Sequence, residues 1–172
     1  PLRLTDVDAP VAGLGEAILR VRSVGICGSD IPAPAERGLP RLGGILGHEV
    51  AGEITEIGPA PFGDWSIGDR VFVISQLSCG ECGACLLGEN HNCENLGFFG
   101  ALGDDQTDGA YAEYLRVRTP DLIAVPGHIS LDIAALVEPL ATGLMLIREA
   151  ELGIGETVVV LGAGPIGPTP AS

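Results

Sequence analysis

Four of the five cysteines lie close together in the sequence, at Cys79, Cys82, Cys85 and Cys93. Four thiolates at such short spacings suit a tetrahedral Zn²⁺ site that leaves no coordination position open, which is typical of a structural zinc. Paired disulfides are the alternative, although the two-residue spacings would close very small loops. The spacing therefore predicts a zinc-stapled lobe at 76–96.

The fifth cysteine, Cys27, stands apart, and a Gly-His-Glu triplet containing His48 and Glu49 follows about twenty residues later. A catalytic zinc needs about three protein ligands and one open position. Cys27, His48 and a carboxylate, from Glu49 or Glu138, would provide them. Taken alone, a single cysteine is more often a small buried apolar residue, and Glu138, beside Pro139, is equally a solvated or capping carboxylate. The combination favours a second, reactive zinc.

A zinc held in this way is a Lewis acid, which lowers the pKa of bound water from about 15.7 to about 7. An alcohol bound there is expected to become an alkoxide and to transfer a hydride to a nicotinamide. A place for that cofactor is indicated by the Gly-x-Gly-x-x-Gly pattern of Gly162, Gly164 and Gly167, which directly follows the apolar run 157–161. The three patterns together predict an oxidoreductase.

The elements that must position these residues change in character near Ser130. Short runs of β-forming residues separated by turns predict a β-barrel or sandwich, with strands at 17–24, 49–57, 70–74, 111–117 and 122–125. Ser130 is expected to cap a helix, and Pro139 to end or kink it and to lie in the first turn of a second helix, roughly 140–150. The run 157–161 lacks alternation, which predicts a strand buried on both faces.

The 172 residues carry a formal net charge of −14. A chain this acidic is repelled by phosphate backbones and anionic lipids, so we expect neither nucleic acid nor a membrane surface as a partner. The longest apolar stretch, 133–147, is interrupted by Glu138 and Pro139 and does not predict a membrane span. The cysteine spacing favours metal binding in a reducing compartment, which indicates the cytoplasm.

The sequence resembles the zinc-dependent medium-chain alcohol dehydrogenase family, near its polyol and threonine dehydrogenase branch. The similarity includes the four-cysteine lobe and the glycine turn, together with motifs at 25–30, 47–58, 68–71, 109–114 and 137–140. It implies a mainly β fold with some α: a GroES-like β-barrel catalytic domain at 1–138, including the zinc lobe. A linking helix and the start of a Rossmann dinucleotide-binding domain would follow at 139–172, truncated after its first strand and glycine turn.

The same resemblance assigns roles to the metal-site residues by position. Cys27, His48 and Glu49 would bind the catalytic zinc, and Glu138 would be a fourth ligand, direct or through water. The four lobe cysteines would hold the structural zinc, which makes two zinc ions per chain. Ser29 matches the hydroxyl that passes the alcohol proton away from the zinc.

The cofactor, NAD or NADP, would lie farther along the chain. Thr142 and Gly143 match positions near the nicotinamide. The positions that match the pyrophosphate turn are Gly162, Gly164, Ile166 and Gly167.

One position departs from the family pattern. Many members carry a relay histidine five residues after the catalytic cysteine, and this chain has Pro32 there. Proline cannot carry a proton, so the relay would end at Ser29, at water or at another group. A proline at this position resembles the sugar-alcohol-phosphate dehydrogenases and points toward a polyol.

The implied activity is the zinc-dependent, NAD(P)-linked oxidation of a small secondary alcohol or polyol to a ketone. The family is usually homo-oligomeric, but the domain that usually forms the interface is expected to be largely missing here. We also expect the isolated chain to be inactive or nearly so. The alternative is a non-catalytic zinc-binding domain in which zinc is only structural.

Overall fold

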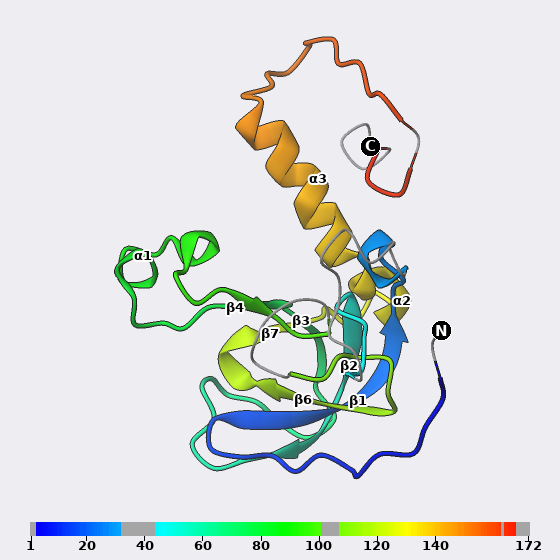
Figure 1. Cartoon of the computed structure of the whole chain (residues 1–172), viewed down its shortest axis with the longest axis vertical. Coiled ribbons are helices and arrows are strands. Elements are labelled where there is room, and N and C mark those ends of the chain that lie inside the picture. Colours follow the sequence, from blue (N-terminus) through cyan, green and yellow to red (C-terminus); the bar gives the residue numbers. More distant parts are fainter. Residues whose placement is uncertain (1–2, 32–43, 101–106, 163, 168–172) are drawn as a thin grey trace.

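The computed structural model describes residues 3–31, 44–100, 107–162 and 164–167 (Figure 1). The strands are β1 (Glu16–Val24), β2 (Val50–Ile57), β3 (Arg70–Val73), β4 (Gln76–Leu77), β5 (Gly97–Phe98), β6 (Tyr114–Arg118) and β7 (Leu122–Ala124). The helices are α1 (Gly83–Leu86), α2 (Leu131–Ala135) and α3 (Val137–Glu149), with 3₁₀ turns at Gly28–Asp30, Asn90–Asn92 and Thr119–Asp121. The relay position Pro32 lies outside the described residues.

Five strands form one antiparallel sheet in the order β6-β1-β2-β3-β7. In a flat sheet, four spacings of about 4.8 Å would separate the two edge strands by about 19 Å. Only a 3₁₀ turn connects β6 to β7, and the chain from Arg118 to Leu122 can span at most about 15 Å. The sheet must therefore curl until its edges approach, as in the barrel that the sequence predicted.

The curled sheet encloses a core built from alternate residues of its strands. Leu19, Ile54, Val71 and Val73 are fully buried in this core. Register shifts in the β1–β2 pairing lie at two places in β1, where they allow the strand to bend with the sheet. Buried Thr119 fixes the turn between β6 and β7, because its hydroxyl accepts from the Phe62 N–H and donates to the Gly15 carbonyl.

The five strand predictions before residue 126 are confirmed with one shift. The run predicted at 111–117 becomes β6, which begins only at Tyr114. The residues before it pair elsewhere: the N–H groups of Ala110 and Tyr111 donate to the carbonyls of Gly47 and Leu46 at 2.8 Å each. These bonds tie the segment to the loop before β2, where two of the candidate site residues lie.

The helix predictions are also confirmed. The Ser130 hydroxyl accepts from the Ile133 N–H at the start of α2, and Pro139 lies in the first turn of α3. Ala134 and Ala135 of α2 pack with Ala51 of β2 in a second, smaller core. Beyond α2, α3 extends away from the sheet (Figure 1). Among the described segments no helix has the length and hydropathy needed to cross a membrane.

The prediction of a strand at 157–161 is wrong for this structure. Neither sheet includes these residues, and Val159 and Leu161 are largely exposed. An apolar run becomes a strand only by hydrogen bonding to a neighbouring strand. No other described segment pairs with this run, so its β-forming side chains have no ladder to join.

The cysteine lobe joins the sheet through a narrow neck. β4 and β5 pair antiparallel, with Leu77 opposite Gly97, and the lobe lies between them. From β6, the Arg118 guanidinium donates to the Ser78 carbonyl at 2.9 Å, one residue before the first lobe cysteine. It also donates twice to the buried Asp121 carboxylate, at 2.6 and 2.9 Å. Arg118 thus fastens the lobe to the barrel.

We expect the substitution Arg118→Met to lower the free energy of unfolding by about 1–2 kcal/mol. This lies between the values for exposed ion pairs and for buried charge-assisted hydrogen bonds, because Arg118 is partly exposed. Arg116→Met on the same strand is the matched control, since Arg116 is more exposed and forms only a 3.7 Å ion pair with Glu16; its effect should stay within about 0.5 kcal/mol. Urea unfolding of both variants measures the difference, and equal effects would contradict the role given to Arg118.

Candidate metal centres

Three potential metal ligands converge at the end of the β1–β2 pair. A ligand atom of each of Cys27, His48 and Glu49 lies within 4.8 Å of the other two. The pairing of Val24 with Val50 continues beyond the strands, because the Gly25 N–H donates to the Glu49 carbonyl at 2.8 Å. The antiparallel ladder therefore places the residues after β1 beside those before β2, although they are more than twenty positions apart in the sequence.

The close approach at this point requires a glycine at position 25. A Cβ built on Gly25 would contact Oε2 of Glu49 and lie 3.0 Å from two further atoms of that side chain. The Glu49 carboxylate therefore occupies the space that any larger residue at position 25 would fill. Glu49 is itself buried, at 7% exposure, so its side chain has little room to move aside.

A second glycine, Gly47, shapes the backbone before His48. It has φ +98°, a region that residues with a Cβ rarely adopt. A Cβ there would lie 2.8 Å from the ring of Tyr111. The glycine of the Gly-His-Glu triplet therefore turns the chain and makes room for this aromatic ring.

The structure adds Asp30, which the sequence analysis did not identify. Asp30 is buried, and its Oδ1 lies 3.7 Å from Nδ1 of His48. Both atoms are buried and have no hydrogen-bond partner among the described residues. With the proton on Nδ1, His48 would direct that N–H toward Asp30 and leave Nε2 free for a metal. The signal in the sequence was an acidic residue three positions after Cys27.

The other carboxylate oxygen of Asp30, Oδ2, accepts two hydrogen bonds. It accepts from the backbone N–H of Cys27 at 2.9 Å and from the hydroxyl of Tyr111 at 2.7 Å. Burial raises the pKa of Tyr111 well above its ordinary value, and the hydrogen bond to Asp30 adds to the shift. The phenol therefore stays protonated and remains a donor.

Glu138 and Ser29 lie on other elements near this cluster. Glu138 is in the first turn of α3 and does not belong to the three-residue group. Burial raises its pKa, while the charge of His48 lowers it and that of Glu49 raises it, so Glu138 is within electrostatic range of both. Ser29 is partly buried in the 3₁₀ turn between Cys27 and Asp30.

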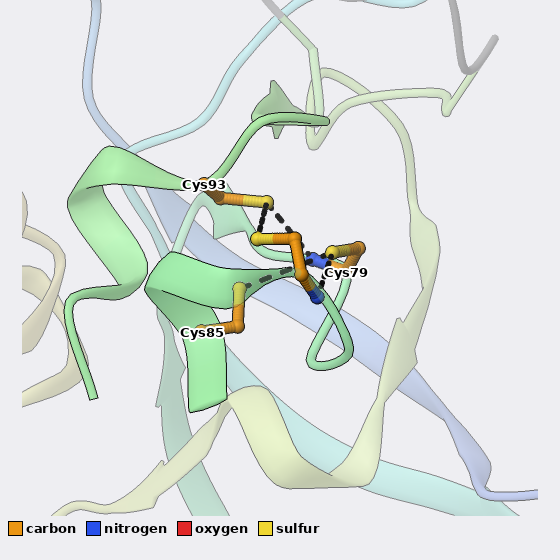
Figure 2. Close-up of side chains that lie close together, drawn as sticks. Cys79, Cys85 and Cys93 are labelled. Atoms are coloured by element: carbon orange, nitrogen blue, oxygen red, sulfur yellow. Dashed lines mark hydrogen bonds between the residues drawn. The ribbon is translucent and has the colours of Figure 1, made fainter. Parts of the chain in front are cut away.

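The second cluster comprises the four lobe cysteines, whose sulfur atoms all lie within 4.8 Å of one another. Figure 2 shows the side chains of Cys79, Cys85 and Cys93 directed toward a common centre. The Sγ atoms of Cys79 and Cys85 are 3.9 Å apart, as are those of Cys82 and Cys93. Tetrahedral zinc with bonds of about 2.3 Å places sulfur atoms about 3.8 Å apart. All four cysteines are free in the structure, as a metal site requires.

Backbone groups already favour thiolate at part of this cluster. The N–H groups of Glu81 and Cys82 lower the pKa of Cys79 to about 6, and the pKa of Cys82 is lowered as well. Partial burial instead raises the pKa of Cys85 to about 12. Four adjacent thiolates repel one another, so their joint ionisation needs a cation at the centre. The donors and their geometry fit a closed Zn²⁺ site.

The predicted cofactor positions follow on α3 and beyond it. Thr142 is exposed and Gly143 is buried on α3, and beyond this helix the chain arches back to the glycine turn (Figure 1). In that turn Gly162 has φ +110° and the Gly167 N–H donates to the Gly164 carbonyl at 3.0 Å. A Cβ on Gly167 would contact the Gly162 carbonyl oxygen, so the turn as folded depends on glycine there. Ile166 is part of the same turn.

Comparison with known proteins identifies relatives for most of the chain. The alcohol dehydrogenase GroES-like domain matches residues 13–127. L-galactonate-5-dehydrogenase from Escherichia coli K12 is 38% identical over 93% of this chain and 46% of its own length. L-threonine 3-dehydrogenase from Pyrococcus horikoshii is 37% identical over 95% of this chain and 47% of its own.

Comparison with solved structures also identifies dehydrogenases as similar to this chain. Galactitol-1-phosphate dehydrogenase from Escherichia coli superposes with a TM-score of 0.84 at 30% identity, over 96% of this chain and 46% of that one. A short chain alcohol dehydrogenase from Escherichia coli CFT073 in complex with NADH gives a TM-score of 0.80 at 32% identity, over 95% and 46%. The chain spans about half the length of the curated relatives it matches.

We expect the substitution Gly25→Ala to impair metal binding at Cys27, His48 and Glu49, because the added methyl group displaces the Glu49 carboxylate. Gly28→Ala is the matched control on the other side of Cys27, since a Cβ there meets no atom within 4 Å. Titration of the apoprotein with Zn²⁺ should show a loss of about one site in the first variant alone. Equal zinc binding by the two variants would contradict this packing argument.

Proposed function

Because the chain belongs to the alcohol dehydrogenase GroES-like domain family, we propose that it is the catalytic part of a zinc-dependent dehydrogenase. The activity would be the NAD(P)-linked oxidation of a secondary alcohol or polyol to a ketone. The observation that carries this proposal is the presence of two different metal-ligand clusters in one domain of this family. One cluster is closed by four cysteines, and the other offers only three ligands of three different types.

The two clusters would have different tasks. A fourth thiolate completes the coordination of a zinc in the lobe, so that site has no position for substrate. Cys27, His48 and Glu49 would leave one position open, which Glu138 would complete, directly or through water, when no substrate is bound. A zinc ion there would supply Lewis-acid chemistry, lowering the pKa of an alcohol hydroxyl.

The residues around the reactive cluster would hold it and move a proton. Asp30 would accept a hydrogen bond from Nδ1 of His48 and so keep Nε2 directed at the metal. The hydroxyl of Ser29 would take the proton of the substrate alcohol and pass it to water or to another group. The burial of His48 and Glu49 limits access of water to the ligands.

The hydride acceptor would be NAD or NADP. We place its pyrophosphate at the turn of Gly162, Gly164, Ile166 and Gly167, and its nicotinamide near Thr142 and Gly143. Residues 1–138 would then form the catalytic domain, and 139–172 would begin the dinucleotide-binding domain. The related Escherichia coli alcohol dehydrogenase in complex with NADH supports this type of cofactor.

A polyol or another hydroxyl-rich small molecule is the favoured substrate class. Relatives named for L-galactonate, L-threonine and galactitol 1-phosphate all act on a compound with several polar groups beside a hydroxyl. The net charge of −14 argues against nucleic acid and anionic membranes as partners. We propose the cytoplasm as the compartment, where a thiolate lobe remains reduced.

The zinc content of the purified chain tests the two-site proposal. Elemental analysis should give about two zinc ions per wild-type chain and about one in Cys27→Ser, with the lobe still filled. Serine binds zinc more weakly than cysteine does. The substitution should leave the lobe zinc in place because the two clusters share no residue. One zinc in both proteins would favour the alternative, a domain in which zinc is only structural.

Activity of the 172-residue chain by itself is a separate prediction. We expect no measurable NAD(P)-dependent alcohol oxidation and only weak binding of NADH. The glycine turn follows a run that pairs with no described strand, and a dinucleotide fold needs that sheet to hold its turn in place. NADH fluorescence titration and a polyol oxidation assay measure both properties, and robust turnover would contradict the prediction.

A further inference from the structure

We propose that Tyr111 is a positioning residue for the reactive zinc site, acting through Asp30 on His48. The inference rests on the proposed function, since it concerns the metal ligands named there. It adds a residue outside the three-residue cluster, whose hydroxyl donates to the Asp30 carboxylate.

Tyr111 is held in place from two directions. Its backbone N–H donates to the Leu46 carbonyl at 2.8 Å, and the preceding Ala110 donates to the Gly47 carbonyl at the same distance. Its ring fills the space beside Gly47, where a Cβ would lie only 2.8 Å from Cδ1. These contacts hold the ring against the backbone that leads into His48 and so restrict where its hydroxyl can lie.

The hydroxyl reaches a buried acceptor that is linked to the site. It lies 2.7 Å from Oδ2 of Asp30 and 3.1 Å from the carbonyl of Gly25. A phenylalanine ring would pack against Gly47 equally well, so packing alone does not account for the hydroxyl. Its two neighbours both belong to the segment that presents Cys27, which indicates a role at the metal site.

Tyr111 and Cys27 together orient the Asp30 carboxylate. Oδ2 accepts from both the Tyr111 hydroxyl and the Cys27 N–H, which leaves Oδ1 to face Nδ1 of His48 at 3.7 Å. A buried carboxylate that loses one of two donors can rotate to recover hydrogen bonds elsewhere. Rotation would remove Oδ1 from His48 and with it the group that fixes the orientation of the imidazole.

The first experiment compares zinc affinity at the reactive site. Tyr111→Phe removes only the hydroxyl, and competition with a chromophoric chelator measures release of the more weakly held zinc from the full chain. We expect about a tenfold loss of affinity, at the low end of the range for outer-shell partners of a metal ligand. Tyr114→Phe is the matched control, because Tyr114 lies three residues away with a 40% exposed side chain and should leave the affinity unchanged.

A double-mutant cycle distinguishes positioning from a general loss of structure. In an Asp30→Ala background the path from Tyr111 to His48 is already broken, so adding Tyr111→Phe should change the zinc affinity less than twofold. A cooperative urea unfolding transition in every variant reports that the barrel is folded. Additive effects of the two substitutions would overturn the proposal, as would an unchanged affinity in Tyr111→Phe.

The zinc content of the wild-type protein distinguishes failure of this proposal from failure of the proposed function on which it rests. A wild-type chain that holds only the lobe zinc overturns both the proposed function and the role of Tyr111. A wild-type chain with two zinc ions, combined with an unaltered Tyr111→Phe variant, overturns the role of Tyr111 alone. Two zinc ions, weaker binding in Tyr111→Phe and a non-additive cycle support both.

Discussion

The antiparallel pairing of β1 with β2 is the interaction on which the reactive cluster depends. Its last strand pair joins Val24 and Val50, and the Gly25 N–H extends the ladder to the Glu49 carbonyl. The ligands lie just beyond the paired region, so their separation is set by the backbone hydrogen bonds of a buried sheet rather than by loop flexibility. The pairing of β6 with β1, continued by the hydrogen bond from the Val21 N–H to the Glu113 carbonyl, brings the segment with Tyr111 to the same place.

The two metal clusters differ in how the chain assembles them. The lobe cysteines lie close together in the sequence, and backbone N–H groups point at their sulfur atoms. That cluster needs little from the barrel beyond the neck of β4 and β5 and the hydrogen bond from Arg118 to Ser78. Cys27, His48 and Glu49, in contrast, have no site until the barrel has formed. Unfolding of the lobe alone would therefore affect the other cluster only through the shared fold.

The buried polar atoms at the reactive site differ in whether they have hydrogen-bond partners. Oδ2 of Asp30 has two donors, whereas Oδ1 of Asp30 and Nδ1 of His48 face each other and have no hydrogen-bond partner in the described part of the chain. Unsatisfied buried atoms cost stability, and native proteins retain them mainly where a function requires it. A metal at Nε2 would give the His48 ring a reason for its orientation. The unpaired atoms thus point to the metal site independently of the cysteine spacing.

The sequence by itself determined the features that are local: the closed four-cysteine lobe, the short strands, the Ser130 cap and the glycine turn, each fixed by neighbouring residue types. It also indicated Cys27, His48 and Glu49 as partners, although only by their types and by a family resemblance. The tertiary structure alone decided that these three converge, that Asp30 and Tyr111 stand behind His48, and that 157–161 pairs with no strand. Contacts between distant segments depend on sheet register and curvature, and a strand depends on its neighbour, so neither can be deduced from local residue patterns.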